Sequence, residues 1–95
     1  MLNADLTAPN STVDELFARF GAAVFQLQPT ADLTPTLWVD TADLLTVLAH
    51  LQRQFPMLLD LFGIDERLRE HKPPAAEDFT VVYHLLNLED REEIR

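Results

Sequence analysis

The 95-residue sequence contains no cysteine and only two glycines, Gly21 and Gly63. Without cysteine the chain cannot form disulfides, supply a thiol nucleophile, or bind zinc or iron–sulfur clusters through thiolates. Two glycines are too few for a dinucleotide-binding fingerprint or a phosphate-binding P-loop. The usual sequence patterns for holding a cluster or a nucleotide are therefore absent.

Basic residues are also scarce, because 7 Lys and Arg stand against 16 Asp and Glu, for a formal charge of −9. No Lys/Arg cluster is present that could displace counterions from nucleic acid. The same acidic charge disfavours adhesion to an anionic membrane surface, and it helps to keep a domain soluble. We therefore expect neither a nucleic-acid partner nor direct contact with lipid headgroups.

Long apolar runs are missing as well. The first ten residues, MLNADLTAPN, contain no basic n-region and no apolar h-region, so they do not resemble a signal peptide. No apolar run approaches the roughly 20 residues that a membrane-spanning helix needs. The sequence predicts a soluble chain whose association with any membrane depends on partners.

The residues that are present suit a packed domain, since 47% of them are hydrophobic. We expect residues 1–11 to form a mobile N-terminal lead-in, because they are small and polar. Residues 12–95 are expected to form a single α+β domain. Its predicted architecture is a small mixed or antiparallel sheet with two or three helices packed on it.

Two helices are predicted from capping residues and apolar spacing. Thr12 and Glu15 match a capping box, and Gly21 suits a left-handed C-terminal cap after the first helix. Asp40 can cap a second helix of about 13 residues. The apolar stripe expected for that second helix consists of Leu44, Leu45, Leu48 and Leu51.

Strands are predicted in the remaining segments. Short ones are expected at residues 24–28 and 36–39, and long ones at 57–68 and 79–88. The two long segments are apolar on both faces, which indicates interior strands. Ile94 and Arg95 look like the opening of a further strand. We therefore expect the sequence to be the N-terminal fragment of a longer protein.

Carboxylates around the first long strand are the main candidates for chemistry. Strand alternation places Asp60 on the apolar face with Leu58, where a buried carboxylate needs a donor or a raised pKa. Arg67 or Arg69 is the expected donor. Asp65 and Glu66 are neighbours and should point to opposite faces, so they are poorly placed to share a metal ion.

Other chemistry-bearing residues do not form a recognisable set. The three histidines are widely separated, and His84 is predicted to be a hydrogen-bonded core residue rather than a ligand or proton relay. No serine or threonine occupies a nucleophile elbow. We predict no catalytic, cofactor-binding or metal-binding residue in this chain. An interface or buried polar role is expected for Asp60, Asp65, Glu66, Arg67 and His84.

Two segments carry a resemblance to a known family. Residues 60–69, DLFGIDERLR, and residues 78–85, DFTVVYHL, resemble the N-terminal part of the 30 kDa subunit of bacterial respiratory complex I, which is NADH-quinone oxidoreductase. In bacteria this is the C subunit, and the DERLR run is most similar to the form in which the C and D subunits are fused. Upstream, RFG, QPT and LWV are similar to that form too, so the resemblance covers about residues 14–95. One departure is Phe62, where the fused form usually has histidine.

This resemblance implies a cofactor-free structural subunit with the fold of the 30 kDa subunit. It would lie in the hydrophilic arm on the cytoplasmic side of the bacterial inner membrane, as a peripheral component that supports electron transfer from NADH to quinone. The expected partners are other hydrophilic-arm subunits, especially the quinone-site and iron–sulfur subunits. NADH, FMN, the iron–sulfur clusters and quinone would all be bound by partners. The enzymatic activity would therefore belong to the complex, and this chain would contribute no catalytic residue.

Three alternatives remain open from the residues alone. The first is a free-standing acidic adaptor or immunity-type binding module, which would need protected sheet edges. The second is the homologous subunit of a related hydrogenase complex. The third is a small hydrolase, which would require Asp60 and His84 to converge in a pocket.

Overall fold

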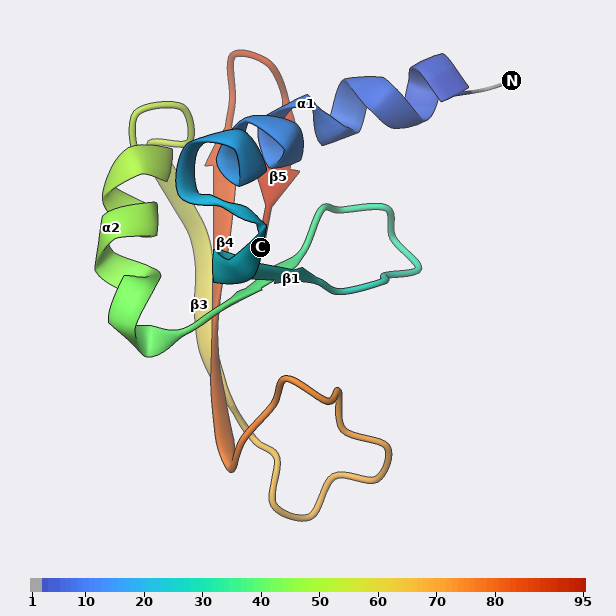
Figure 1. Ribbon diagram of the computed structural model, residues 1–95, viewed down its shortest axis with the longest axis vertical. Helices are drawn as coiled ribbons and strands as arrows, with labels where there is room; N and C mark the ends of the chain where they lie inside the picture. The colour runs from blue at the N-terminus through green and yellow to red at the C-terminus, as the bar shows by residue number, and fades with distance from the viewer. Residues whose placement is uncertain (1–2) are drawn as a thin grey trace.

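The computed structural model describes the backbone of residues 3–95 and the side chains of residues 12–95. It confirms the predicted α+β class. The β3–β4 hairpin runs along the length of the molecule, with α2 beside it and α1 across its upper end (Figure 1). In chain order the elements are α1 (Asn3–Phe20), the 3-10 turn η1 (Ala22–Val24), β1 (Phe25–Leu27), β2 (Leu37–Val39), α2 (Thr41–Leu51), β3 (Met57–Asp65), β4 (Phe79–Asn87) and β5 (Glu92–Ile94).

The strands form two antiparallel sheets, β1–β2 and β3–β4–β5. Backbone hydrogen bonds join these sheets at Arg95, whose N–H donates to the Pro35 carbonyl at 2.9 Å and whose carbonyl accepts from the Leu37 N–H at 2.8 Å. A residue that bonds to positions i and i+2 of its neighbour shows the pattern of parallel strands. The end of β5 therefore lies beside β2 and parallel to it.

The hydrophobic core lies between the two helices and one face of the β4–β5 pair. Leu85 and Ile94 are directly opposite in the register, so their side chains point to the same face. The ring centroids of Phe17 and Phe25 lie 5.5 Å apart in an edge-to-face arrangement, so α1 packs against β1 at this point. The buried cluster draws on both helices, three strands and the segment after α2, and consists of Leu16, Phe25, Val47, Leu51, Phe55, Leu85 and Ile94.

The first helix begins earlier than its predicted capping box. Since α1 starts at Asn3, Thr12 lies inside the helix, and its hydroxyl donates to the Glu92 carboxylate at 3.2 Å instead of capping. Gly21 has the expected positive φ of 92°, but its ψ of 150° is extended rather than left-handed helical. The mobility predicted for residues 1–11 stays a prediction.

The second helix buries a different stripe from the expected one. Val47 and Leu51 are buried, whereas Leu45 is exposed. Positions 44, 47, 48 and 51 follow the i, i+3, i+4, i+7 spacing of one helical face, and position 45 is rotated about 100° away from position 44. Val47 therefore takes the place in the stripe that was predicted for Leu45.

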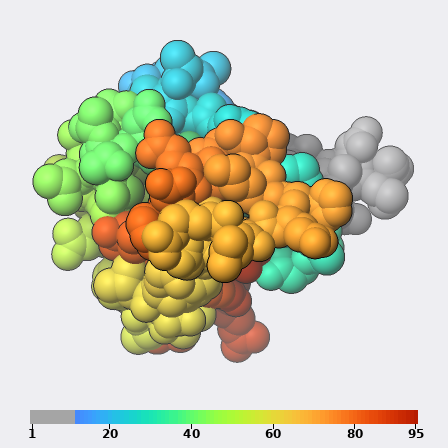
Figure 2. Space-filling view, turned by 90° about the horizontal axis from the view of Figure 1, so that it is seen from below, coloured from blue at the N-terminus to red at the C-terminus, as the bar shows by residue number. Residues whose placement is uncertain are grey.

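The prediction that both long strands are interior was wrong for β3. In the described part of the chain β4 has a strand on each side, but β3 pairs only with β4 and forms the edge of its sheet. Its apolar side chains are largely exposed. The view from below shows β3, in yellow, at the surface beside the loop that leads to β4 (Figure 2).

A β-bulge at Leu59 changes which β3 side chains share a face. Leu58 pairs with Leu85, and Asp60 pairs with His84, so Leu59 is the extra residue. Because adjacent β4 residues point to opposite faces, Leu58 and Asp60 do so too. The predicted common face of Leu58 and Asp60 was therefore wrong. Leu58 shares the face of Leu85, although about half of its surface is exposed.

Candidate functional site

Glu66, directly after β3, is the one charged residue buried among the described side chains, with 1% of its surface exposed. Its carboxylate accepts hydrogen bonds from the Thr80 hydroxyl at 2.6 Å and the Arg69 guanidinium at 2.8 Å. The Thr80 hydrogen bond, together with Arg69, lowers the pKa of Glu66 despite the opposing effect of burial. Both donors come from the β3–β4 hairpin, so this carboxylate ties the hairpin loop to β4.

Asp65 forms a separate ion pair on the surface. Its two carboxylate oxygens accept from the Arg67 guanidinium at 3.0 and 2.8 Å. The Arg67 side-chain and backbone hydrogen bonds lower the pKa of Asp65. Asp65 and Glu66 thus use different partners and do not share a site.

Asp60 is exposed on β3 and lacks the arginine partner expected from the sequence. Its carboxylate accepts from the Leu61 backbone N–H at 2.9 Å, while Arg67 and Arg69 bind Asp65 and Glu66. The expectation of an Asp60–arginine pair was therefore wrong. The cause is the hairpin loop, which turns both arginines back toward the carboxylates beside them.

His84 is hydrogen-bonded but only partly buried, and it lies on the face of β4 opposite to the core residue Leu85. Its Nε2 lies 2.7 Å from Oε1 of Glu93 on β5. Although His84 and Asp60 are opposite in the register, each is engaged elsewhere and neither lines the main cavity. This arrangement offers no converging acid–base pair of the kind that the hydrolase alternative required.

Metal-ligating side chains do not gather in the part of the chain that the structure describes. No group of three or more Asp, Glu or His residues there is placed to hold an ion. In the same residues, no helix is both long and apolar enough to cross a membrane.

The β3–β4 hairpin carries an exposed apolar surface, here called the β3 apolar surface. It combines side chains of β3 with the first residues of β4, and at its end the Arg67 guanidinium lies over the Phe79 ring at 4.9 Å. The register places Leu61, Phe79 and Val81 on one face of the hairpin and Phe62 on the other, so the exposed apolar side chains lie on both sides of the edge strand. Exposed apolar side chains gathered in this way often mark protein interfaces. The surface consists of Met57, Leu58, Leu59, Leu61, Phe62, Phe79 and Val81.

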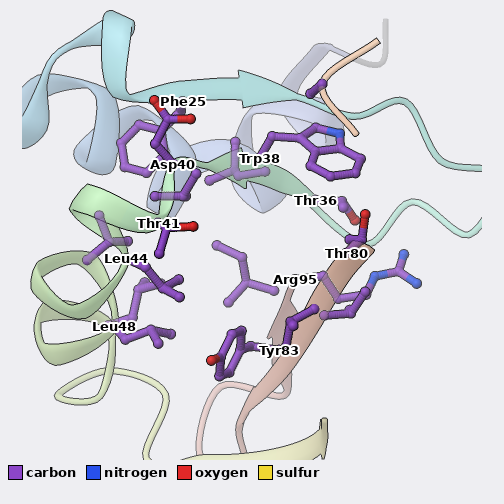
Figure 3. A pocket seen from close by; sticks show the side chains of 18 of the residues that line it. Phe25, Thr36, Trp38, Asp40, Thr41, Leu44, Leu48, Thr80, Tyr83 and Arg95 are labelled. Carbon is purple, nitrogen blue, oxygen red and sulfur yellow. The ribbon is translucent and has the colours of Figure 1, made fainter. Parts of the chain in front are cut away.

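A cavity of about 490 Å³ lies between α2, β2 and β4. Figure 3 shows Leu44 and Leu48 of α2 on one side, with Trp38 of β2 and Tyr83 of β4 also lining it. The Trp38 indole N–H donates to the Gln28 side chain at 2.7 Å, which fixes the ring beside the cavity. The cavity is open and partly apolar, and it contains no clustered catalytic groups.

Arg95 closes one end of this cavity through a long-range ion pair that was not predicted from the sequence. Its guanidinium lies 2.7 and 2.8 Å from the two carboxylate oxygens of Asp32. The pKa of Asp32 is lowered first by the Thr34 backbone N–H and further by Arg95. No sequence pattern joins two residues 63 positions apart, so only the meeting of the two sheets could reveal this pair.

Comparison with known proteins places the sequence in a family. The family model described as "Respiratory-chain NADH dehydrogenase, 30 Kd subunit" matches residues 37–95, which is more than half of the chain. The chain belongs to this family. The match begins at β2 and includes the β3 apolar surface and the Glu66 hydrogen bonds.

Curated relatives agree with this family and with the fused form. The C/D subunit of NADH-quinone oxidoreductase from Acidiphilium cryptum is 42% identical over 93% of this chain. The C/D subunits from Chromohalobacter salexigens and Acinetobacter baumannii are 47% and 40% identical over 92% and 100% of the chain. The chain spans only 15 to 18% of the length of these three relatives.

The fold of this member of the 30 kDa subunit family also matches a solved structure. That structure is described as "Nqo5 of the trypsin-resistant fragment (1-134) in P63 form" and has a TM-score of 0.72. The match covers 86% of this chain and 65% of the other, at 19% sequence identity. Together, family and fold favour the complex I resemblance over an adaptor or immunity-type module.

Proposed function

We propose that this chain is a cofactor-free structural part of the hydrophilic arm of a proton-translocating NADH:quinone oxidoreductase. In this role it positions neighbouring subunits while they carry out electron transfer from NADH to quinone. Its partners are the quinone-site and iron–sulfur subunits, and its location is the cytoplasmic side of the bacterial inner membrane, where it is held by those partners.

Family membership is the observation that supports this proposal most strongly, because the match covers the segment from β2 to Arg95. The β3 apolar surface supports it independently. In a free monomer, an edge strand with exposed leucine and phenylalanine side chains promotes aggregation. A permanent partner that covers the strand prevents this. The candidate polar residues bond to backbone or to side chains of neighbouring elements, as expected of a scaffold rather than a catalytic centre.

The proposal is tested in a strain whose gene for this segment is replaced by variants. Leu61→Lys places a charge in the middle of the β3 apolar surface, where we expect it to impair assembly of the complex. The measurements are the amount of assembled complex on native gels and the NADH:quinone reductase activity of membranes. NADH oxidation with an artificial acceptor reports separately on the cofactor-binding partners.

Leu68→Lys is the matched control, since Leu68 is 95% exposed in the hairpin loop outside that surface. We expect this variant to assemble normally. Deletion of the whole segment should abolish quinone reductase activity. Fully assembled, fully active complex without the segment would overturn the proposed function.

A further inference from the structure

The register of the β3–β4 hairpin shows which backbone groups of β3 point outward. The Glu66 N–H donates to the Asp78 carbonyl at 2.8 Å, so the backbone groups of every second residue before Glu66 also point toward β4. Those of the alternate residues Leu61, Gly63 and Asp65 point away from β4. In the described part of the chain no strand lies on that side. This edge therefore has the geometry to accept a further strand.

Asp60 already occupies one of these outward-pointing groups. Its carboxylate accepts from the Leu61 N–H at 2.9 Å. A strand that paired with β3 at this point would need the same N–H, and it would have to displace a charged acceptor to reach it. Asp60 is exposed and is the one charged residue within residues 57–64. The opposite residue, His84, uses its Nε2 for Glu93.

Two further features restrict pairing along this edge. The bulge at Leu59 directly precedes Asp60 and interrupts the regular spacing of the backbone groups. At the other end, the Asp65 carboxylate accepts from the Arg67 backbone N–H at 3.1 Å and pairs with the Arg67 guanidinium. Bulges and charged side chains are common means of protecting a sheet edge from further strands. Gly63, in the middle, has no side chain to provide such protection.

A second copy of this chain would meet a specific obstacle at Asp60. In a two-fold antiparallel arrangement centred on Gly63, Leu61 of each copy would lie opposite Asp65 of the other and would exchange hydrogen bonds with it. Asp60 would then lie opposite Glu66, and like charges directly opposite each other destabilise a strand pair. Both the hydrogen bond and the charge of Asp60 oppose this arrangement.

We propose that Asp60 is an edge-protecting residue that keeps β3 of the free chain from pairing with β3 of a second copy. Its carboxylate covers the Leu61 N–H, and its negative charge repels an equally acidic chain. This role accounts for a charge in the middle of an otherwise apolar edge strand. It concerns the free chain and does not rest on the proposed function.

The test replaces the carboxylate and measures association. Asp60→Thr removes the charge and the carboxylate acceptor but keeps a residue that favours strands. We expect the association constant, from sedimentation velocity over a range of concentrations, to rise by about tenfold or more. The reason is that each two-fold pair would gain two free N–H groups and lose two like charges.

Amide hydrogen exchange by NMR identifies the surface through which the variant associates. In Asp60→Thr, exchange at the outward-pointing Gly63 amide should slow as the protein concentration rises. The Phe62 amide points toward Val82 on β4 and should be protected at every concentration. Association without slower exchange at Gly63 would show a different contact and would overturn the proposal.

Two single variants separate the hydrogen bond from the charge. Asp60→Asn keeps an oxygen that accepts from the Leu61 N–H but removes the charge, so its increase in association should be smaller than that of Asp60→Thr. Glu70→Thr is the matched control, because Glu70 is exposed in the hairpin loop outside this edge. It removes one negative charge as well and should leave association unchanged. An equal increase in Glu70→Thr, or no increase in Asp60→Thr, would overturn the proposal.

A second substitution should reverse the effect of the first. Gly63→Pro removes the outward N–H at the centre of the edge, and proline is tolerated on edge strands where the N–H faces solvent. A side chain has room there, since the nearest atom to an added Cβ is the Thr80 carbonyl oxygen at 3.7 Å. Asp60→Thr combined with Gly63→Pro should associate no more than the original chain, with circular dichroism confirming that it is folded. Undiminished association of the folded double variant would contradict pairing through the β3 edge.

Discussion

β3 and β4 are alike in length and apolar character, but the second half of β4 is more buried than any part of β3. Leu85 on β4 is 8% exposed, whereas Leu61 on β3 is 51% exposed. Both strands have nine residues and apolar side chains on both faces. The second half of β4 is better covered than β3 because β5 flanks it there and the helices lie against one of its faces. In the described residues β3 has a neighbouring strand on one side only.

This difference shows that an apolar strand can serve two purposes. In β4, Leu85 is part of the core of the domain itself. In β3 they leave a surface whose burial requires another chain, as the proposed role in a multisubunit complex provides.

The largest expected effect is on stability and comes from truncating the buried strand. Leu85→Ala should lower the free energy of unfolding by about 2–5 kcal/mol, because it removes core contacts and leaves a cavity. Leu61→Ala should cost less than about 1 kcal/mol, since half of that side chain is already in water. Urea denaturation of the isolated chain measures both. Equal losses would contradict the assignment of β4 to the core and β3 to the surface.

A smaller, pH-dependent effect is expected at the buried carboxylate beside the hairpin loop. The folded pKa of Glu66 lies below its ordinary value of 4.5, so the unfolded chain binds more protons as the pH falls through that range. Its stabilising contribution is therefore present above about pH 4.5 and is lost as the pH falls through the lower folded pKa.

Thr80→Val removes the hydroxyl that contributes most to lowering this pKa, with little change in shape. The variant should be less stable than the original chain at pH 7, and the difference should shrink on acidification. Asp32 and Asp65 also have lowered pKa values. Both residues are present in the variant and in the original chain, so their contributions to the pH dependence of stability cancel when the two proteins are compared. Denaturation midpoints between pH 3 and 7 provide the measurement, and a pH-independent difference would refute the assigned role of Glu66.

A third and still smaller effect is expected on self-association rather than on stability. Phe62→Lys should make the isolated chain more monomeric, because it interrupts the β3 apolar surface and adds charge to an edge strand. Sedimentation velocity over a range of concentrations measures this effect. Leu68→Lys, outside that surface, should leave the association unchanged; equal shifts in both variants would indicate a general charge effect.

The smallest effect is expected at Asp60. Asp60→Asn should change the free energy of unfolding by no more than about 0.5 kcal/mol, because the side chain is exposed and an amide oxygen can still accept from the Leu61 N–H. Thermal and urea denaturation check this result. A larger loss would mean that the charge of Asp60 has a partner beyond this backbone contact.

Much of the fold was predictable from local chemistry. Apolar periodicity located α2 and both long strands. The helical spacing of Leu44, Val47, Leu48 and Leu51 is present in the sequence, although the predicted stripe contained Leu45 instead of Val47. The start of α1 was missed because Thr12 matched a capping box inside a longer helix. The roles predicted for Asp60, Asp65, Glu66, Arg67 and His84 remain predictions, although their hydrogen-bond partners are now defined.

The sequence by itself determined the class of fold, the acidic surface, the absence of thiol chemistry and the family resemblance, because each depends on composition or on residues close together in the chain. Tertiary structure decided which long strand is interior, where the Leu59 bulge reverses a face, and how Arg95 meets Asp32. It also formed the cavity between α2, β2 and β4. Those features depend on strand order and register, and local side-chain patterns do not specify which strand lies beside which.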